Sequence, residues 1–421
     1  MEQGCARDNG YLQDGRRVTV SPRTFLFLTQ VYVPDPAAVG QHLADAAEEL
    51  AARGHRVIVY TASQGYDDPS IHYQSREMLR GVDVRRVPFS SFGKSSILVR
   101  LAGGLLFVAQ TVARSFAQPG IDAVVVSTSP PMASLGALII AGFHRARVKY
   151  WVMDVNPDQI VALGMARAGS LPVRVFEWIN REVLRRADDV IVLDRFMAER
   201  INRKADVSAK LSVLPPWPAE DPEVVVEHSA NPFRAAHGLD GKTVVMYSGN
   251  HGPSNPLATI LQAAVRVRDE TKLHFMFIGG GVGKSEVEAA VGENIESLPY
   301  QPQEYLKYSL AAADVHLVTM GDAIRGIVHP SKVYGAMAAG RPIFLIGPDE
   351  NHVSDLIGEH DIGWHVSHGD VDATERVLRD IARMSPGELA AMGNRARHAV
   401  HASGGKHGAV GRLCDVLERG V

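Results

Sequence analysis

The hydrophobic and polar positions divide this chain into short apolar runs that alternate with stretches of helical period. Such alternation is typical of βαβ units, in which helices join parallel strands. We therefore predict an α/β fold. The predicted strands are Thr24–Thr29, Arg56–Tyr60, Val82–Val87, Asp122–Ser127, Val148–Val152, Asp189–Leu193, Leu211–Leu214, Val244–Ser248, Leu273–Ile278, Ile295–Leu298, Val315–Thr319, Ile343–Ile346 and Gly363–Val366.

The alternation stops at Pro215-Pro216-Trp217-Pro218 and the acidic stretch that follows. A chain of 421 residues is too long for one ordinary core, so we interpret this interruption as a domain boundary. We expect a flexible leader (1–23), an N-terminal domain (24–218), a linker (219–240) and a C-terminal domain (241–400). Residues 401–421 are expected to form a C-terminal helix that packs back on the N-terminal domain.

Charge and composition exclude several classes of function. The formal charge of −3 gives no reason to expect nucleic-acid binding. The 17 histidines form no H-x-x-H or H-E-x-x-H motif, and the two cysteines, Cys5 and Cys414, lie near opposite ends. We therefore expect no metal site and no disulfide framework, as suits a reducing cytoplasm. The first residues lack the apolar core of a secretory signal, and no apolar run is long enough to span a bilayer.

One apolar stretch, Ile97 to Phe116, carries only Arg100 and Arg114 as charges. It has two interpretations. It is either a helix buried in the domain core or a surface that meets a membrane or a lipid-linked acceptor.

The stretch from Met320 to Pro342 follows a predicted strand and opens a helix at Pro330. Ser331 and Lys332 fall in the first turn of this helix, where backbone N–H groups are free, and Arg325 precedes it. Free N–H groups and two cations suit a phosphate or diphosphate. The alternative is a solvated loop with a small-residue packing face.

Glycines follow two other strands of the second half. Gly249-Asn250-His251-Gly252 follows one strand, and Gly279-Gly280-Gly281-Val282-Gly283 follows the next. Glycine lets the backbone approach a phosphate closely, although a flexible turn is the alternative. A Walker loop would need glycine where Ile278 stands, and a dinucleotide fingerprint would need it at Lys284, so neither motif is present.

The first half offers fewer candidates. Gly40 opens a helix and could let a ligand approach across the cleft between the domains. Asp154 ends a strand and could serve as a base or a polar anchor, or could instead cap the next segment. Asp158, beside Pro157, is interpreted as a helix-start acid.

Taken together and in this order, several segments of the chain resemble the GT-B-fold glycosyltransferases of family 4. Within that family they resemble the bacterial surface-polysaccharide group that includes colanic acid and O-antigen transferases. The segments that carry the resemblance are the Gly40 loop, Arg53–Val57, Val124–Pro131, Asp154–Gly164, Tyr247–Asn250, Phe277–Gly281, Leu298–Pro302, Ala311–Leu317 and Pro330–Pro342.

The resemblance implies two Rossmann-like domains that face each other across a cleft. It implies a nucleotide-diphosphate sugar on the C-terminal domain, an acceptor on the N-terminal domain, retention of anomeric configuration, and no metal. By matching position, Arg325 and Lys332 would hold the diphosphate. Gly279 to Gly281 would approach the nucleotide, with Gly249 and Asn250 beside them, and Tyr300 would lie near the base. Gly40 would make room for the donor phosphate.

The chain departs from the family pattern at three positions. Ile327 and Gly335 stand where many members carry two glutamates, the second of which contacts ribose. Met153 stands where many members carry a histidine before the acceptor-side acid. Ribose recognition must therefore differ here, and Asp154 is left as the candidate for activating the acceptor.

We therefore expect a retaining glycosyltransferase that moves a sugar from a UDP-linked donor to the hydroxyl of a sugar, a lipid-linked saccharide or a small molecule. No cofactor and no nucleic-acid partner is expected. The protein is expected in the cytoplasm, with peripheral contact at the inner face of the membrane. A UDP-sugar epimerase of the same fold and an inactive nucleotide-sugar-binding subunit are the alternatives.

Overall fold

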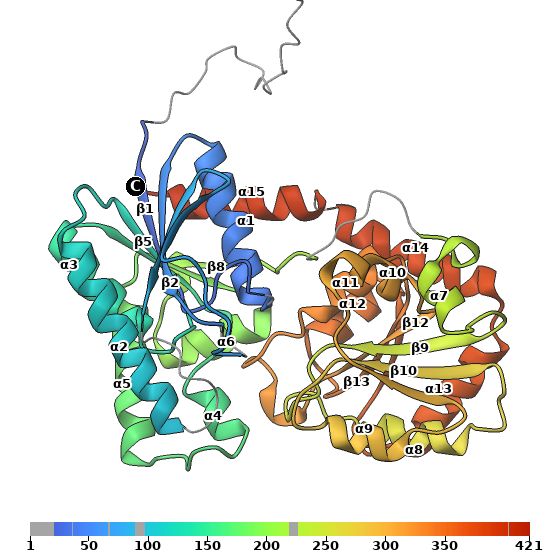
Figure 1. Cartoon of the computed structure of the whole chain (residues 1–421). Coiled ribbons are helices and arrows are strands. Elements are labelled where there is room, and N and C mark those ends of the chain that lie inside the picture. The colour runs from blue at the N-terminus through green and yellow to red at the C-terminus, as the bar shows by residue number, and fades with distance from the viewer. Residues whose placement is uncertain (1–20, 36, 66–67, 89–96, 219–225, 403) are drawn as a thin grey trace, which may run out of the picture.

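The structure, a computed structural model, describes residues 21–35, 37–65, 68–88, 97–218, 226–402 and 404–421. Two α/β domains lie side by side (Figure 1). The expected leader lies outside the described residues as far as residue 20, and so do residues 219–225 of the expected linker.

The N-terminal domain holds an eight-stranded sheet in the order β3-β4-β2-β1-β5-β6-β7-β8. Neighbouring strands are parallel except for β3 and β4, which are antiparallel. The strands are β1 (Thr24–Leu28), β2 (Arg56–Ala62), β3 (Arg76–Leu79), β4 (Val82–Val87), β5 (Ala123–Ser127), β6 (Arg147–Trp151), β7 (Asp189–Val192) and β8 (Leu211–Val213). The helices are α1 (Ala38–Ala52), α2 (Ile97–Phe116), α3 (Ala133–His144), α4 (Asp158–Ala162), α5 (Leu171–Arg186) and α6 (Arg195–Lys204).

The C-terminal domain holds a six-stranded parallel sheet in the order β11-β10-β9-β12-β13-β14. Its strands are β9 (Thr243–Ser248), β10 (Leu273–Ile278), β11 (Ile295–Leu298), β12 (Val315–Thr319), β13 (Ile343–Ile346) and β14 (Gly363–Val366). Its helices are α7 (Pro232–Ala236), α8 (Ala258–Arg266), α9 (Lys284–Ala290), α10 (Leu306–Ala311), α11 (Lys332–Ala338), α12 (His352–His360), α13 (Val371–Arg383) and α14 (Pro386–Ala402). The last helix of the chain is α15 (Gly405–Glu418).

The central strands are apolar along their whole length because helices cover both faces of each sheet. Phe25, Leu26 and Phe27 of β1 have no exposed surface, and neither does Phe275 of β10. In each sheet the strand order reverses once, beside β1 and β5 in the first and beside β9 and β12 in the second. Ligands of open α/β sheets bind outside the carboxyl ends of the strands at such a reversal.

The predicted strands are present within one or two residues, but the edge strand β3 was not predicted. Its residues alternate between exposed and half-buried, because β3 lies at the edge of the sheet. A short polar segment of this kind lacks the apolar run on which the prediction rested.

The predicted helix start at Pro330 was wrong by two residues. Pro330 and Ser331 instead form a tight turn, in which Val333 N–H donates to Pro330 O at 3.2 Å and Tyr334 N–H to Ser331 O at 3.2 Å. Regular α-helix therefore begins at Lys332, and it ends at Ala338.

The predicted linker is also shorter than expected, because residues 228–240 fold with the C-terminal domain. Phe233 and Leu239 are buried in one apolar cluster with Val244 and Met246 of β9. Arg234 donates to the carbonyl oxygens of Ala312 and Leu239 at 2.6 and 2.7 Å.

Helix α15 returns from the C-terminal domain and packs against α1 (Figure 1). Cys414 and Leu417 of α15 join the core of the N-terminal domain. Arg53 donates to Asp415 Oδ1 at 2.8 Å and to Glu418 Oε2 at 3.0 Å. Helix α15, which follows the C-terminal domain in the chain, is thus anchored in the N-terminal domain.

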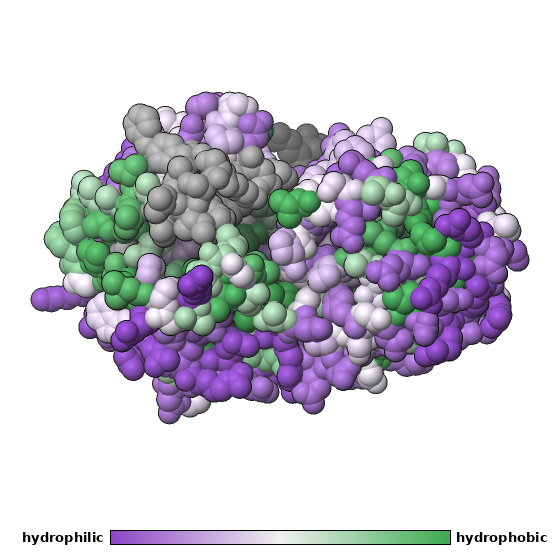
Figure 2. All heavy atoms as spheres, turned by 90° about the horizontal axis from the view of Figure 1, so that it is seen from below, coloured by the Kyte–Doolittle hydropathy of each residue, from purple (hydrophilic) through white to green (hydrophobic). Residues whose placement is uncertain are grey.

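None of the helices in the described parts of the chain is long and apolar enough to cross a membrane. Figure 2 shows a mostly hydrophilic surface over the C-terminal domain. Hydrophobic residues gather at the left edge of the N-terminal domain, where Figure 1 places α2 and α3.

Candidate active site

Two glycine turns, at the carboxyl ends of β9 and β10, lie against each other. A Cβ at Gly279 would overlap the carbonyl oxygen of Gly249, and a Cβ at Gly281 would overlap the side-chain oxygen of Asn250. Gly279 and Gly281 have φ values of +142° and +122°, which L residues with side chains rarely adopt. The two turns therefore meet in one place, and only glycine fits these positions.

Lys332 reaches the same place from the start of α11. Its Nζ donates to the hydroxyl oxygen of Tyr247 at 2.6 Å and to Oδ1 of Asn255 at 3.3 Å. A Cβ at Gly249 would lie 3.4 Å from this Nζ. The side chain is half-buried, and burial lowers the pKa of the amine to about 7. Because no described carboxylate pairs with Lys332, its ammonium is available to an anionic ligand.

The ring of Tyr247 packs against the Lys332 ammonium. Lys332 Nζ lies 4.0 Å from the ring centroid, and the Tyr247 hydroxyl donates to the carbonyl oxygen of Asn250 at 2.7 Å. His251 stacks on Tyr247 with a centroid distance of 5.3 Å. Burial and the charges of Lys284 and Lys332 lower the pKa of His251 to about 4, so this imidazole adds no positive charge.

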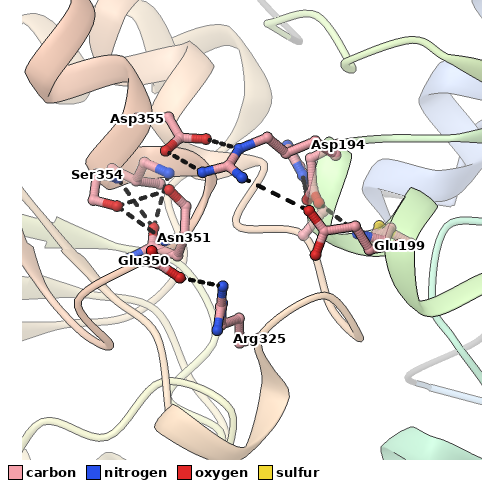
Figure 3. A network of polar contacts seen from close by, with 11 residues as sticks. Asp194, Glu199, Arg325, Glu350, Asn351, Ser354 and Asp355 are labelled. Atoms are coloured by element: carbon pink, nitrogen blue, oxygen red, sulfur yellow. Dashed lines mark hydrogen bonds and ion pairs between the residues drawn. The ribbon is translucent and has the colours of Figure 1, made fainter.

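Arg325 lies elsewhere on the loop between β12 and α11 (Figure 3). Its Nη2 donates to Glu350 Oε2 at 2.7 Å, and its guanidinium carbon lies 4.7 Å from the ring centroid of Phe196 in α6. No contact between described residues joins Arg325 to Lys332. The two predicted cations therefore have different partners: Lys332 contacts Tyr247 and Asn255, and Arg325 is paired with Glu350.

Asp154 lies where the two domains touch. Its backbone forms an isolated antiparallel bridge with Val328, and Val155 N–H donates to Ile327 O at 2.8 Å. The backbone N–H of Asp154 also donates to Thr128 Oγ1 at 3.2 Å. Burial raises the pKa of the Asp154 carboxyl to about 6. Asp154 is therefore close in space, although not in sequence, to the loop that precedes Lys332, and its carboxyl can accept a proton near neutral pH.

Comparison with known proteins fits this geometry. A family model described as "Glycosyl transferase 4-like domain" matches residues 37–217. WbjE of Pseudomonas aeruginosa, named as a glycosyltransferase, is 28% identical over 289 residues, which cover 66% of this chain and 70% of WbjE. WcaI of Escherichia coli (strain K12), named as a colanic acid biosynthesis glycosyl transferase, is 26% identical over 324 residues, which cover 73% of this chain and 79% of WcaI.

Solved structures match the whole architecture. Sucrose-phosphate synthase from Thermosynechococcus elongatus has a TM-score of 0.75 at 15% identity, over 94% of this chain and 98% of that one. Anabaena HepE, solved in complex with UDP and glucose, has a TM-score of 0.69 at 14% identity, over 94% of this chain and 99% of HepE. Residues 37–217 of this chain are thus similar to family 4 glycosyltransferase domains. The predicted GT-B fold is confirmed.

Three other residues were predicted to contribute to the donor site: Gly40, Ser331 and Tyr300. A Cβ at Gly40, in α1, would lie 3.1 Å from the Cα of Tyr32. The absence of a side chain at Gly40 therefore makes room for the backbone of Tyr32. Ser331 precedes α11 and makes no side-chain capping bond. Tyr300 follows β11 and is exposed, and its ring lies 3.2 Å from where a Cβ at Gly280 would stand.

The departures from the family pattern have structural counterparts. Ile327 is buried and packs into the core of the N-terminal domain, so the loop before α11 is anchored there by an apolar side chain. A Cβ at Gly335 would meet only Leu310 Cδ1, at 3.6 Å. Met153 is buried among core residues. None of these positions supplies a carboxylate or an imidazole to the candidate site.

Sequence reasoning missed Asn255 and Glu350 and gave Tyr247 no role. Glu350 follows β13, so the rule that ligands meet strand carboxyl ends could have pointed to it. Asn255 precedes α8, within Ser254-Asn255-Pro256, and nothing local indicates that it faces Lys332. Among the described residues, no group of three or more histidines, cysteines and acids could hold a metal ion.

The pH profile of kcat/KM should show whether Asp154 acts as a base. The wild-type rate is expected to fall as the pH drops below about 6, because the carboxyl then becomes protonated. Asp154→Asn should be slow throughout and should lose this acid limb. Thr128→Val, which changes only the partner of the Asp154 backbone N–H, is the control and should keep it. An unchanged acid limb in Asp154→Asn would assign the limb to another group.

Proposed function

We propose that this chain is a retaining glycosyltransferase that transfers a sugar from a UDP-sugar to an acceptor hydroxyl without a metal ion. The single observation that carries the proposal is the environment of the Lys332 ammonium. This ammonium is half-buried, has a lowered pKa, and has only neutral partners between two glycine turns. A diphosphate supplies the missing negative charge, and a charge-assisted contact is strongest in such a poorly solvated place.

In this assignment the glycine turns approach the nucleotide of the donor, and Lys332 binds its diphosphate. Backbone at Gly249, Gly279 and Gly281 can come close to the nucleotide because no side chain stands in the way. Lys332 stabilises the negative charge that develops on the diphosphate as the bond to the sugar breaks. Tyr300, exposed beside Gly280, offers an aromatic ring to the uracil. UDP is chosen because HepE, a solved structure of the same fold, binds it.

The acceptor binds on the N-terminal domain, near Asp154 and Thr128. A lipid-linked saccharide is the favoured acceptor, because WcaI is named for the synthesis of colanic acid. The protein then works in the cytoplasm at the inner face of the membrane, where such acceptors are presented.

Release of UDP from a panel of UDP-sugars tests the proposal. UDP that forms only when an acceptor is present supports transfer, and the anomeric configuration of the product, read by NMR, tests retention. An epimerised UDP-sugar without UDP release would show the epimerase instead. Tight UDP binding without turnover of any donor would show an inactive binding subunit.

Arg325→Ala is expected to cost about 2–4 kcal/mol of transition-state stabilisation and to lower kcat/KM for transfer accordingly. This requires Arg325 to leave Glu350 and to contact the diphosphate when the donor binds. Glu350→Gln is the control: it frees Arg325 from its partner and should leave kcat/KM unchanged or raise it. Wild-type kcat/KM in Arg325→Ala would remove Arg325 from the donor site.

A further inference from the structure

Three helices of the N-terminal domain, α2, α3 and α5, each expose large apolar side chains in a stripe of helical period. Helix α5 exposes Leu171, Val175 and Trp178, with 72%, 48% and 62% of their surface accessible. Helix α3 exposes Ile139 and Phe143. Leu105, Leu106 and Phe116 are exposed on α2, although Phe107 of the same helix is fully buried. Helix α2 is therefore neither wholly buried nor wholly a surface helix.

The three stripes form one surface, because α3 packs against both α2 and α5. Phe116 of α2 and Phe143 of α3 touch, with ring centroids 4.6 Å apart. At Gly136 of α3 a Cβ would lie only 3.1 Å from Val108 Cγ1 of α2, so these two helices pack closely. Figure 2 shows the resulting hydrophobic edge. We call this surface the α2/α3/α5 face.

Positive charge surrounds the α2/α3/α5 face. Eight exposed arginines lie on these helices or within four residues of their ends, against four acids that are half-buried or buried, Glu177, Glu182, Asp188 and Asp189, although the whole chain carries −3. The arginines are Arg114, Arg145, Arg147, Arg167, Arg174, Arg181, Arg185 and Arg186. Helical spacing places Arg174, Arg181 and Arg185 on the same side of α5 as Leu171 and Trp178.

We propose that the α2/α3/α5 face docks this protein on an anionic lipid bilayer. Apolar and aromatic side chains of a basic, amphipathic surface insert at the boundary between headgroups and acyl chains, and the arginines meet the anionic headgroups. Charge decides against a second copy as the occupant, because two such faces would place their arginine-rich helices against each other. Monomeric soluble proteins rarely leave a contiguous apolar patch exposed across several helices unless it binds something.

The face also adjoins the acceptor side of the cleft. A Cβ at Gly104 of α2 would lie 3.6 Å from Pro130, in the turn after β5, and Thr128 of that turn contacts the Asp154 backbone. A bilayer on the α2/α3/α5 face therefore lies beside the acceptor end of the site. The inference rests on the proposed function for the lipid-linked acceptor and names the surface that brings the site to it; lipid docking itself requires no donor and is measured without one.

Binding of the full chain to vesicles tests this proposal. Vesicles that contain phosphatidylglycerol and phosphatidylcholine should bind the protein, and pure phosphatidylcholine should bind it at least about tenfold more weakly. The emission of Trp178 should shift to the blue on binding. Trp151 and Trp217 are buried already, and the half-buried Trp364 lies in β14 of the C-terminal domain, so Trp178→Phe should remove most of this shift.

Two variants of the face have matched controls. Leu171→Ala/Trp178→Ala and Arg174→Gln/Arg181→Gln should each weaken binding to anionic vesicles by at least about tenfold. The controls, Val282→Ala/Val291→Ala and Arg383→Gln, change exposed residues of the C-terminal domain and should bind as wild type does. Absence of vesicle binding, equal binding to neutral vesicles, or a dimer that the face variants dissociate would each overturn the proposal. UDP release with a water-soluble acceptor should be unchanged in the face variants, which separates this result from a failure of the proposed function.

Discussion

Replacement of Lys332 by methionine is expected to lower kcat/KM for sugar transfer by about 10²–10³-fold, as loss of one preorganised electrostatic donor does. Methionine keeps most of the side-chain volume and removes the charge. The folded protein should lose no stability, because the ammonium of Lys332 is poorly solvated and has no carboxylate partner. Lys307→Met is a suitable control: this lysine also lies over a tyrosine, 5.0 Å from the ring centroid of Tyr308, but on the exposed surface.

The pKa of Lys332 adds a signature that a purely structural lysine would not show. In the free protein the amine is protonated below about pH 7 and increasingly neutral above it. A bound diphosphate favours the protonated form, so binding of UDP above pH 7 must take up about one proton. The affinity for UDP should then fall as the pH rises from 7 towards 9, by up to about tenfold per pH unit.

Calorimetry in buffers of different ionisation enthalpy measures this proton uptake directly. Wild type should take up about one proton per UDP near pH 8.5, and Lys332→Met should take up none from this group. The same lowered pKa predicts that the free energy of unfolding of the wild type rises with pH above 7, because the unfolded chain then holds the extra proton. A UDP affinity that is independent of pH in this range would contradict the assignment of Lys332.

The parts of the site that were predictable from sequence are those made by local pattern. Parallel strands gather the turns at their carboxyl ends along one edge, so the turns at Gly249 and Gly279 were both expected on the donor side, and the structure shows that they also lie against each other. Lys332 was predicted near these turns because it lies at the start of the helix that follows strand β12, and the structure shows it beside Gly249. The family resemblance then identified the whole architecture, which no single motif specifies.

What could not be predicted depends on partners that are far apart in sequence. Arg325 was expected beside Lys332, but Glu350 after β13 and Phe196 in α6 hold its guanidinium. The partnership of Asn255 with Lys332 joins residues 77 positions apart. The raised pKa of Asp154 likewise results from burial where the two domains meet, and the sequence around Asp154 contains no sign of that contact.

Gly279→Ala is expected to abolish binding of UDP and to lower the free energy of unfolding by about 1–3 kcal/mol. The methyl group would overlap the carbonyl oxygen of Gly249, and the backbone φ of +142° is one that alanine rarely adopts. The obstacle is backbone, which cannot swing aside as the end of a side chain can. The turns after β9 and β10 would therefore separate, and the position of Lys332 beside Gly249 would be lost with them. Isothermal titration with UDP and thermal unfolding measure the two effects.

Gly292→Ala is the control for this substitution in the same domain. Its Cβ would meet nothing closer than the carbonyl oxygen of Ala290 at 3.9 Å, so stability and UDP affinity should stay close to those of the wild type. A stabilising ligand also separates folding from binding: UDP should raise the melting temperature of the wild type and of Gly292→Ala but not that of Gly279→Ala. Full UDP affinity in a correctly folded Gly279→Ala would show that the nucleotide does not use the contact between these two turns, and the donor site would then have to be sought elsewhere on the C-terminal domain.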